Sequence, residues 1–439
     1  MFVNSNLNLG ANYIVSCLTG EHFIILQASI IPLNLNGIIK WMLNHCVHKG
    51  NVRCAFSLLR ALRFSLVAPF LMTSTLALAD AQDTVNVIAG LSRTMDDNFF
   101  RKSVAPVSET ITTSYATLSF NKQYSMQRLN FDYTIRSNAY QNFSSLDSVG
   151  NNYKGSWVWS LTPKLTGTVS ALRTESAMSF IDATFVAANK PPILTNEVQN
   201  FLMDWAPQGN LHLLGGFTRT VLLNSSNFFP DRGNTNNSID LGIKYEFPSG
   251  SAVTMMQHQR EGEFANINPS LPQTFSENET EAKFNWRVTA KSSVNTRLAF
   301  VDRTHDQYSS KNYSGLVGDA SFSWTPTSKL QLTASAASNI SVYQSLLANY
   351  ARNNTLSFTP TYACTNKIMV TGSASISERV IEGLNETDTI ENASLGVDWM
   401  PRRYVSIGAK IQKMSRTSTS IINRDFSDLM TTLTASVNF

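Results

Sequence analysis

The sequence predicts an all-β fold: a transmembrane, antiparallel, up-and-down β-barrel of about 18 strands. Three observations lead to this prediction. Apolar and polar residues alternate along many short segments, a turn of an aromatic residue and a proline recurs along the chain, and the last segment is a strand that ends on an aromatic residue.

The C-terminal segment Thr431–Phe439 has the pattern of a half-apolar strand. Leu433, Ala435, Val437 and Phe439 fall on one face, and Thr, Ser and Asn residues fall on the other. A final strand that stops on Phe is typical of bacterial outer-membrane barrels. A soluble antiparallel sheet is the alternative for this segment alone.

The composition favours the barrel. Of the 439 residues 43% are hydrophobic but only 15% are charged, against roughly 25% charged in typical soluble proteins. The body of the chain has no uninterrupted apolar run long enough for a helical span, which needs about 18 residues. Alternating strands leave the average hydropathy unremarkable, so a barrel is compatible with both facts.

Residues 1–79 are predicted to be an upstream extension and a signal peptide, followed by the barrel at 80–439. Arg53, Arg60 and Arg63 precede an apolar run, and the small residues before Asp80 suit a signal peptidase. A short anchor helix is the alternative. Because this signal begins far from residue 1, Met42 is the better-placed initiator, and residues 1–50 have no assigned role.

Without residues 1–79 the chain holds thirty basic and thirty acidic residues, so its net charge is zero rather than +4. A basic patch for nucleic acid therefore has no support. Cys364 is the one cysteine beyond the cleavage point, which excludes a disulfide framework and a cysteine-based metal site.

The clearest alternating segment is Arg128–Arg136, and Ser238–Phe247 and Thr280–Val288 repeat its pattern. Each has an apolar face and a charged face. A charged side chain that faced lipid near the bilayer centre would cost about 2–4 kcal/mol. The charged faces are therefore expected to line the lumen.

An aromatic residue near a strand end recurs at intervals of roughly 40 residues, which is one hairpin plus one longer loop. A proline usually follows it and is expected to end the strand, because proline cannot donate a ladder hydrogen bond. Such aromatic rings suit the membrane interface. A propeller of similar period would need four strands per repeat. The predicted interface aromatics are Trp159, Trp205, Phe247, Trp286, Trp324, Phe358 and Trp399.

Turns and loops are expected to alternate strictly. Short turns are predicted near 122–127, 161–164, 206–209, 248–250, 289–293, 325–328, 360–366 and 400–403. Longer loops are predicted near 94–112, 138–151, 174–196, 220–236, 260–278, 304–312, 340–351, 378–388 and 415–427. These connections give eighteen strands, with both chain ends on the periplasmic side; sixteen strands is the alternative.

A polar lumen follows from this register. Barrels of sixteen to eighteen strands are wide enough for an aqueous channel unless a loop folds in. The loop Thr174–Asn196, with its Pro191-Pro192 pair, is the candidate plug or constriction. The predicted lumen residues are Arg128, Asp132, Arg136, Lys244, Glu246, Glu281, Lys283, Arg287, Arg297, Asp398 and Lys410.

No catalytic or cofactor site is predicted. His212, His258 and His305 fall on different segments, and neither a phosphate loop nor a His-Glu metal motif occurs. The run Asp96-Asp97-Asn98 has the oxygen ligands that Ca²⁺ takes, but a short acidic run in a loop is more often solvated. No metal site is therefore assigned.

The stretch Asp83–Arg101 and the turns Trp159–Leu165 and Trp324–Leu330 carry a family resemblance. The chain resembles the exosortase-associated exopolysaccharide-biosynthesis outer-membrane proteins, the EpsL-like family. The resemblance implies a barrel that guides an exopolysaccharide alongside inner-membrane polymerisation and export proteins. A general or substrate-specific diffusion porin is the first alternative, and a structural or adhesive barrel is the second.

Phe439 has two expected roles. As the last residue of the closing strand it is an interface anchor among the outer-membrane lipids. It is also the expected signal for the outer-membrane insertion machinery, so its deletion is expected to reduce insertion.

Overall fold

The computed structural model describes residues 7–8, 14–15, 84–177, 180–181, 193–225, 233–265, 273–342, 350–384, 386–420 and 424–439. The chain divides into two compact units, Met1–Ala77 and Leu78–Phe439. In the first, strands β1 (Leu7–Asn8) and β2 (Ile14–Val15) pair antiparallel. The predicted signal peptide, its cleavage point and Met42 lie outside the described residues.

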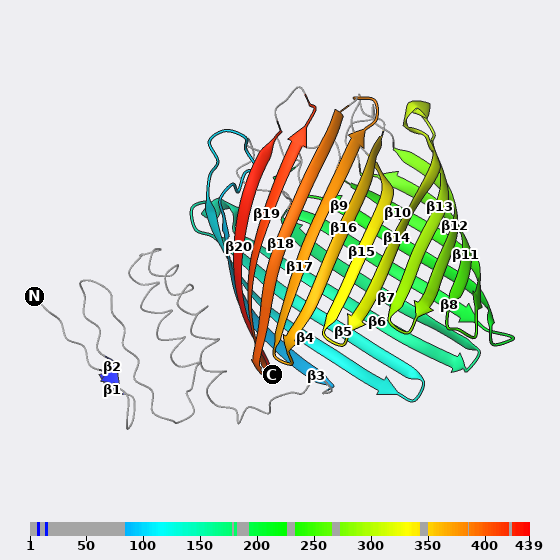
Figure 1. Cartoon of the computed structure of the whole chain (residues 1–439), viewed down its shortest axis with the longest axis horizontal. Helices are drawn as coiled ribbons and strands as arrows, with labels where there is room; N and C mark the ends of the chain where they lie inside the picture. Colours follow the sequence, from blue (N-terminus) through cyan, green and yellow to red (C-terminus); the bar gives the residue numbers. More distant parts are fainter. Residues whose placement is uncertain are drawn as a thin grey trace, which may run out of the picture. The chain divides into compact units, whose positions relative to one another are not determined.

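The second unit is a closed barrel of 18 antiparallel strands, β3 to β20 (Figure 1). The predicted fold class and strand number are therefore confirmed. The strands are β3 Val85–Asp96, β4 Glu109–Tyr124, β5 Gln127–Tyr140, β6 Ser148–Thr162, β7 Leu165–Ala177, β8 Ile193–Trp205, β9 Leu211–Asn224, β10 Gly233–Glu246, β11 Ala252–Phe264, β12 Thr274–Thr289, β13 Ser292–His305, β14 Tyr313–Thr327, β15 Leu330–Val342, β16 Tyr350–Thr365, β17 Ile368–Ile381, β18 Glu386–Arg402, β19 Val405–Ser418 and β20 Phe426–Asn438.

The barrel closes where its last strand meets its first. β20 pairs antiparallel with β3, from Asn438 opposite Ile88 to Met430 opposite Asp96. Phe439 extends this ladder, because its N–H donates to the Val87 carbonyl oxygen (2.7 Å) and its own carbonyl accepts from the Val87 N–H (2.9 Å). The C-terminal segment is thus the eighteenth barrel strand, as its alternation predicts.

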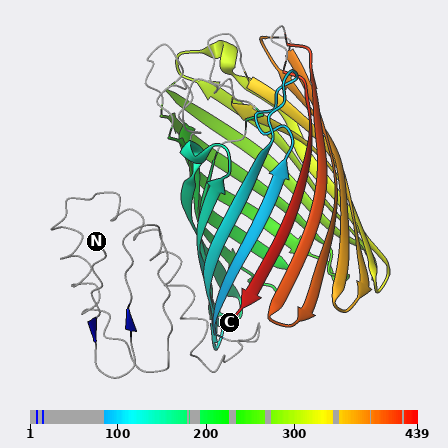
Figure 2. The same ribbon diagram turned by 90° about the vertical axis from the view of Figure 1, so that its left-hand side faces the viewer.

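All the short turns lie at one end of the barrel and the longer loops at the other (Figure 2). Each of the eight predicted turns lies at the junction of the expected pair of strands, although several begin inside the preceding strand, as those at 325–328, 360–366 and 400–403 do in β14, β16 and β18. The strands run further into the loops than predicted: the first loop spans 97–108 rather than 94–112. The strand ends on the loop side carry polar residues on both faces, so the alternation that marks a strand is lost there although the ladder continues.

The expectation that proline ends each strand is wrong at three positions. Pro326, Pro360 and Pro401 lie inside β14, β16 and β18. At Pro326 and Pro401 the pairing register shifts, so the proline sits in a β-bulge where no ladder hydrogen bond is required of it. The bulge, rather than the strand end, accommodates the missing N–H.

The turns share a Thr-x-Lys arrangement. Thr365 Oγ1 accepts from the N–H groups of Lys367 (3.2 Å) and Ile368 (3.1 Å), and Lys367 Nζ donates to the Pro401 carbonyl of the next turn (3.2 Å). The turns at Thr162 and Thr327 make the same threonine contacts. The repeated turn sequence therefore has a structural cause common to neighbouring hairpins.

The predicted interface aromatics lie toward the turn end, with two departures. Tyr362 precedes the end of β16 by the interval at which Trp324 precedes the end of β14, so Tyr362 rather than Phe358 is the equivalent residue. Trp159 is only 8% exposed, whereas Trp324 is 44% exposed. The Trp159 ring lies over Gly167, whose missing side chain leaves the space it fills.

No helix among the described residues combines the length and the apolar composition needed to cross a bilayer.

Candidate functional site

The strand register separates an apolar outer face from a polar inner face. On β5 the exposed residues Leu129, Phe131 and Ile135 point outward, so Arg128 and Asp132 point into the lumen. The pairing between neighbouring strands extends this inward and outward assignment to the rest of the barrel. It places all eleven sequence-predicted residues on the lumen face: Arg128, Asp132, Arg136, Lys244, Glu246, Glu281, Lys283, Arg287, Arg297, Asp398 and Lys410.

One quarter of the lumen carries a continuous ion-pair network, which we term the charged wall. It lies on β10 to β13. Its members are Asp240, His258, Arg260, Glu277, Glu279, Glu281, Lys283, Arg297 and Arg303.

The three glutamates of β12 form the centre of the charged wall. Glu277 accepts from Arg260 (2.5 Å) and from Arg303 Nε (2.6 Å). Glu279 accepts from Arg260 and Arg297. Arg260 and Arg297 thus each bridge two carboxylates, and the network holds β11, β12 and β13 together across their lumen face.

Glu281 continues the network toward β10. It accepts from Arg297 and lies 2.6 Å from Lys283 Nζ. Nε2 of His258 lies 3.5 Å from Glu281 Oε1, and its Nδ1 lies 2.7 Å from Asp240 Oδ1.

The charged wall is layered, with its acids beneath its bases. The side chains of Glu277, Glu279 and Glu281 are 3–4% exposed, whereas those of Arg297 and Lys283 are 23% and 41% exposed. A solute in the lumen therefore meets guanidinium and ammonium groups before it meets carboxylates.

A second ion-pair cluster lies nearer the turns, on β8 to β10. Asp204 Oδ1 contacts His212 Nδ1 at 2.6 Å, and its Oδ2 accepts from Lys244 at 3.2 Å. Lys244 also contacts Glu246 at 2.9 Å. Two of the predicted lumen residues, Lys244 and Glu246, are therefore paired with each other.

The neighbouring strands β14 to β17 present hydroxyl groups, and we term this surface the hydroxyl wall. Ser335 and Ser357 lie 2.7 Å apart, and Thr355 and Ser377 lie 2.9 Å apart. Its members are Ser321, Ser323, Thr333, Ser335, Thr355, Ser357, Thr359, Thr361, Thr371, Ser373, Ser375 and Ser377.

Phe180 and Ile181, between β7 and β8, contact residues of distant strands at the loop end of the barrel. The Phe180 ring lies 5.0 Å from each of Phe99 and Phe100, on the β3–β4 loop. Arg416 of β19 donates to the Ile181 carbonyl oxygen at 2.5 Å. Six strand spacings separate β7 from β19, roughly 29 Å along the wall.

The side chain of Arg416, which donates to Ile181, is itself held by other contacts. Arg416 is 2% exposed and contacts Asp388 at 2.8 Å, and Asp388 also accepts from Arg379 and Ser418. Because Arg416 and Asp388 face the lumen, residues 180–181 lie over the lumen mouth and narrow it.

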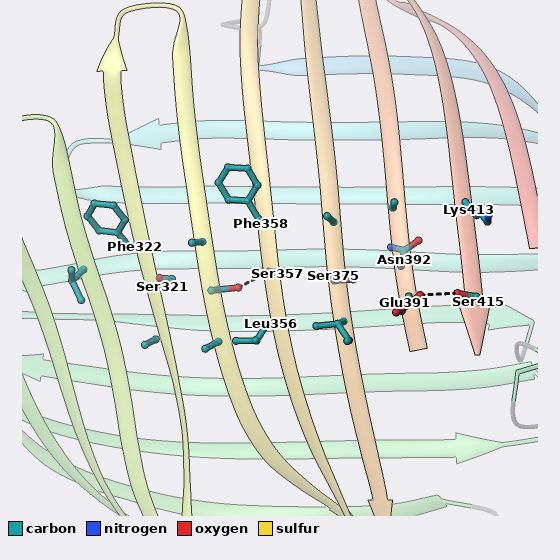
Figure 3. Close-up of a pocket in the computed structure, with 18 of the residues that line it drawn as sticks. Ser321, Phe322, Leu356, Ser357, Phe358, Ser375, Glu391, Asn392, Lys413 and Ser415 are labelled. Carbon is teal, nitrogen blue, oxygen red and sulfur yellow. Dashed lines mark hydrogen bonds between the residues drawn. The ribbon is translucent and has the colours of Figure 1, made fainter. Parts of the chain in front are cut away.

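A hollow on the outer face of the barrel crosses several strands. Small outward residues such as Ala320, Ala334 and Ala374 form its floor. Figure 3 shows it crossing the strands, with Phe322 toward one end and Lys413 toward the other. Its position on the lipid-facing surface separates it from the path of a solute.

The sequence reasoning omitted several members of the charged wall, including Glu277, Glu279 and Arg260. A usable signal existed, because Glu277, Glu279 and Glu281 are spaced two apart and therefore share one face of a strand. Their pairing with Arg260 and Arg297 could not be read from the sequence, since it depends on the register between strands.

The histidines do not form a hydrolytic arrangement. Asp240 Oδ1 accepts from Ser238 (2.5 Å) and lies 2.7 Å from His258 Nδ1, so the acid separates the serine from the histidine. A serine nucleophile would need its hydroxyl on the histidine itself. His305 lies among rings, 6.2 Å from that of Phe264.

The comparisons with known proteins agree with a channel. The family model described as "Putative beta-barrel porin 2" matches residues 279–439. The chain is an outer-membrane β-barrel that is similar to porins over this part of its length. No curated protein matches the chain in sequence.

Solved structures of similar shape are outer-membrane barrels of low sequence identity. OpdK of Pseudomonas aeruginosa, crystallised with vanillate, is 10% identical over 82% of this chain and 100% of its own, with a TM-score of 0.47. OccK9 (OpdG) of the same organism is 11% identical over 81% and 98%, also with a TM-score of 0.47. A BenF-like porin of Pseudomonas fluorescens is 9% identical over 82% and 100%, again with a TM-score of 0.47.

The resemblance to the EpsL-like exopolysaccharide proteins is wrong, because the family match is to a porin. The turns that suggested it, Trp159–Leu165 and Trp324–Leu330, share the threonine hydrogen bonds of ordinary periplasmic hairpins in this barrel. The turn sequence follows from the geometry of these hairpins and does not identify a transported substrate. The diffusion-porin alternative is the better supported function.

Proposed function

We propose that the chain is a substrate-specific diffusion porin whose lumen favours small anionic solutes over cationic ones. The observation that carries the proposal is the layering of the charged wall, in which buried carboxylates hold cationic side chains toward the lumen. The network is close to neutral as a whole, but the groups within reach of a solute are nitrogen donors. Such groups bind carboxylates and phosphates by charge-assisted hydrogen bonds.

The remaining exposed charges in the lumen also favour anions. Among the strand residues that the structure describes, the exposed lumen-facing acids are Glu246 and Asp319. The exposed lumen-facing bases are Arg128, Arg136, Lys154, Arg287 and Lys410. A cleft lined mainly by one sign of charge raises the local concentration of the opposite ion. The exposed excess of bases therefore adds to the preference for anions.

Residues 180–181 supply a size limit. The contacts of Phe180 with Phe99 and of Ile181 with Arg416 place these two residues over the lumen mouth. A narrowed mouth brings a solute close to the walls, where their charge acts over a short distance. This arrangement favours substrate-specific passage over general diffusion.

The experiment is a reversal-potential measurement on the full chain in planar bilayers under a KCl gradient, with Lys283→Glu as the variant. Lys283 is the most exposed base of the charged wall, and Glu281 retains Arg297 without it. We expect wild-type channels to prefer chloride and the variant to lose most of that preference, a change of roughly tenfold in the permeability ratio at low ionic strength.

Arg219→Glu is the matched control. Arg219 makes the same charge change on β9 but lies opposite Asn237 on the outer face. It should leave the permeability ratio unchanged. Wild-type channels that prefer potassium, or a Lys283→Glu channel with the wild-type ratio, would refute the proposed selectivity.

A further inference from the structure

Three carboxylates meet at the seam where the barrel closes. Asp96 ends β3, Asp97 follows it, and Asp428 lies near the start of β20. Their ligand oxygens all lie within 4.8 Å of one another. Asp96 and Asp428 are more than 300 residues apart in sequence, so only the closure of the barrel brings them together.

One guanidinium, that of Arg101, forms ion pairs with two of these three carboxylates. Arg101 Nη1 lies 2.9 Å from Asp96 Oδ1 and 3.2 Å from Asp428 Oδ1. It also donates to the Asn98 carbonyl oxygen at 2.5 Å. Arg101 is thus shared by Asp96 and Asp428, and among the described residues Asp97 has no cationic partner.

Asp428 is the least satisfied member. Its side chain is 0% exposed, and neither of its oxygens has a hydrogen-bond partner in the part of the chain that the structure describes. The Arg101 ion pair reaches Oδ1 alone, so Oδ2 is buried with no partner there. A buried carboxylate in this state is strongly unfavourable unless it takes up a proton or a further cation compensates its charge.

Asp388, at the same barrel mouth, is a buried acid whose two carboxylate oxygens both have partners. It is also 0% exposed, but Arg379 and Arg416 contact one oxygen and Ser418 donates to the other. The contrast with Asp428 is therefore one of partners and not of burial. Asp428 has one ion pair, from Arg101 to Oδ1, and its Oδ2 faces no base in the described part of the chain.

The surroundings of the three aspartates are already ordered. Asp97 Oδ1 accepts from the Leu429 N–H at 2.7 Å, which leaves Oδ2 for a ligand. The Asn98 amide donates to the Ser427 carbonyl at 3.0 Å and so ties the loop to β20. Asp97 is exposed, which gives an ion a route from the mouth.

We propose that Asp96, Asp97 and Asp428 bind one Ca²⁺ ion, which fastens the first and last strands of the barrel together at the lumen mouth. Carboxylate oxygens are the ligands that Ca²⁺ prefers, and waters on the exposed Asp97 side complete its six to eight positions. The cluster has no thiolate or imidazole that would favour zinc. A site with few protein ligands has a Kd of about 10⁻⁴–10⁻³ M, the range of extracellular modules.

The other cluster of metal-ligand type, His258 with Glu279 and Glu281, is different. Arg297 already occupies oxygens of both glutamates, and Arg260 and Lys283 supply further positive charge. These acids need no ion, so the Ca²⁺ proposal is confined to the seam.

The test uses the full chain, extracted from membranes in detergent and freed of metal with EDTA. Titration calorimetry with CaCl₂ should give one site per chain. Millimolar Ca²⁺ should raise the unfolding temperature by about 2 °C, because an ion that binds only the folded state stabilises it. Asp302→Asn, an exposed acid on the outer face of β13, is the matched control and should respond as wild type does.

Asp428→Asn should abolish the Ca²⁺ response, yet in EDTA it should unfold at or above the wild-type temperature, since it removes a poorly paired buried charge. Asp97→Asn changes an exposed residue and should weaken Ca²⁺ binding roughly tenfold without a folding defect. Wild-type protein that binds no Ca²⁺ at 10 mM would refute the site and indicate protons shared among the carboxylates. Variants that keep the wild-type affinity would refute it equally.

Discussion

The charged wall and the hydroxyl wall keep adjacent parts of one lumen polar by different means. On β10 to β13 the polar groups are ions, the three glutamates of β12 are each held by two or more partners, and these carboxylates are almost fully buried. On β14 to β17 they are short hydroxyls such as Ser335 and Ser357, paired across single strand gaps. Both surfaces hydrate the channel, but only the first presents charge to a solute.

The difference also extends to the outer face. The strands that carry the hydroxyl wall have small outward residues such as Ala334 and Ala336, and the outer groove lies there. Strand β12 of the charged wall has Phe284 and Trp286 outward instead, both exposed.

The largest expected effect is on stability and falls on the charged wall. Glu279→Gln removes the carboxylate shared by Arg260 and Arg297, which leaves two largely buried guanidinium groups short of charge. Breaking a buried ion pair from one side costs about 3–5 kcal/mol. Urea unfolding followed by tryptophan fluorescence, in detergent, measures this loss.

Asp319→Asn is the control for that measurement. Asp319 contacts the same Arg297, but at 3.9 Å and with its side chain 51% exposed, so its loss should cost less than about 1 kcal/mol. Similar losses for the two variants would mean that burial does not distinguish the charged wall.

The next effect is on selectivity and needs no substitution. The anion preference that we assign to the charged wall is electrostatic, so salt should weaken it: the Debye length is about 10 Å at 0.1 M and about 3 Å at 1 M. The chloride-to-potassium permeability ratio should therefore fall toward one at high KCl. Passage of a neutral sugar, measured by liposome swelling, should not change with salt. A ratio that is independent of salt would assign the preference to size or hydrogen bonding instead.

The two walls also show which features of the structure can be predicted from the sequence alone. Residues such as Glu281 and Arg297 could be assigned to the lumen because alternation is a local signal and lipid excludes charge from the other face. The turns were equally local, so the strand number and the closure of Thr431–Phe439 against β3 could be predicted as well.

What could not be predicted depends on contacts between distant segments. The pairing of Glu279 with Arg260 follows from inter-strand register, and the approach of Asp428 to Asp96 follows from closure of the whole barrel. The contact of Ile181 with Arg416 depends on the direction that a loop takes. Tyr362 was missed for a different reason, because a proline next to Phe358 was taken as the strand end when it lies inside the strand.

The smallest expected effect is on the hydroxyl wall. Ser335 and Ser357 form one 2.7 Å hydrogen bond beside lumen water, which can replace either partner. In a double-mutant cycle of Ser335→Ala and Ser357→Ala the coupling should be below about 1 kcal/mol, the usual net value of a neutral hydrogen bond. Conductance and the chloride-to-potassium ratio of the double variant should match wild type. If the ratio changes as much as it does in Lys283→Glu, the hydroxyl wall takes part in selectivity and the division of labour between the two walls does not hold.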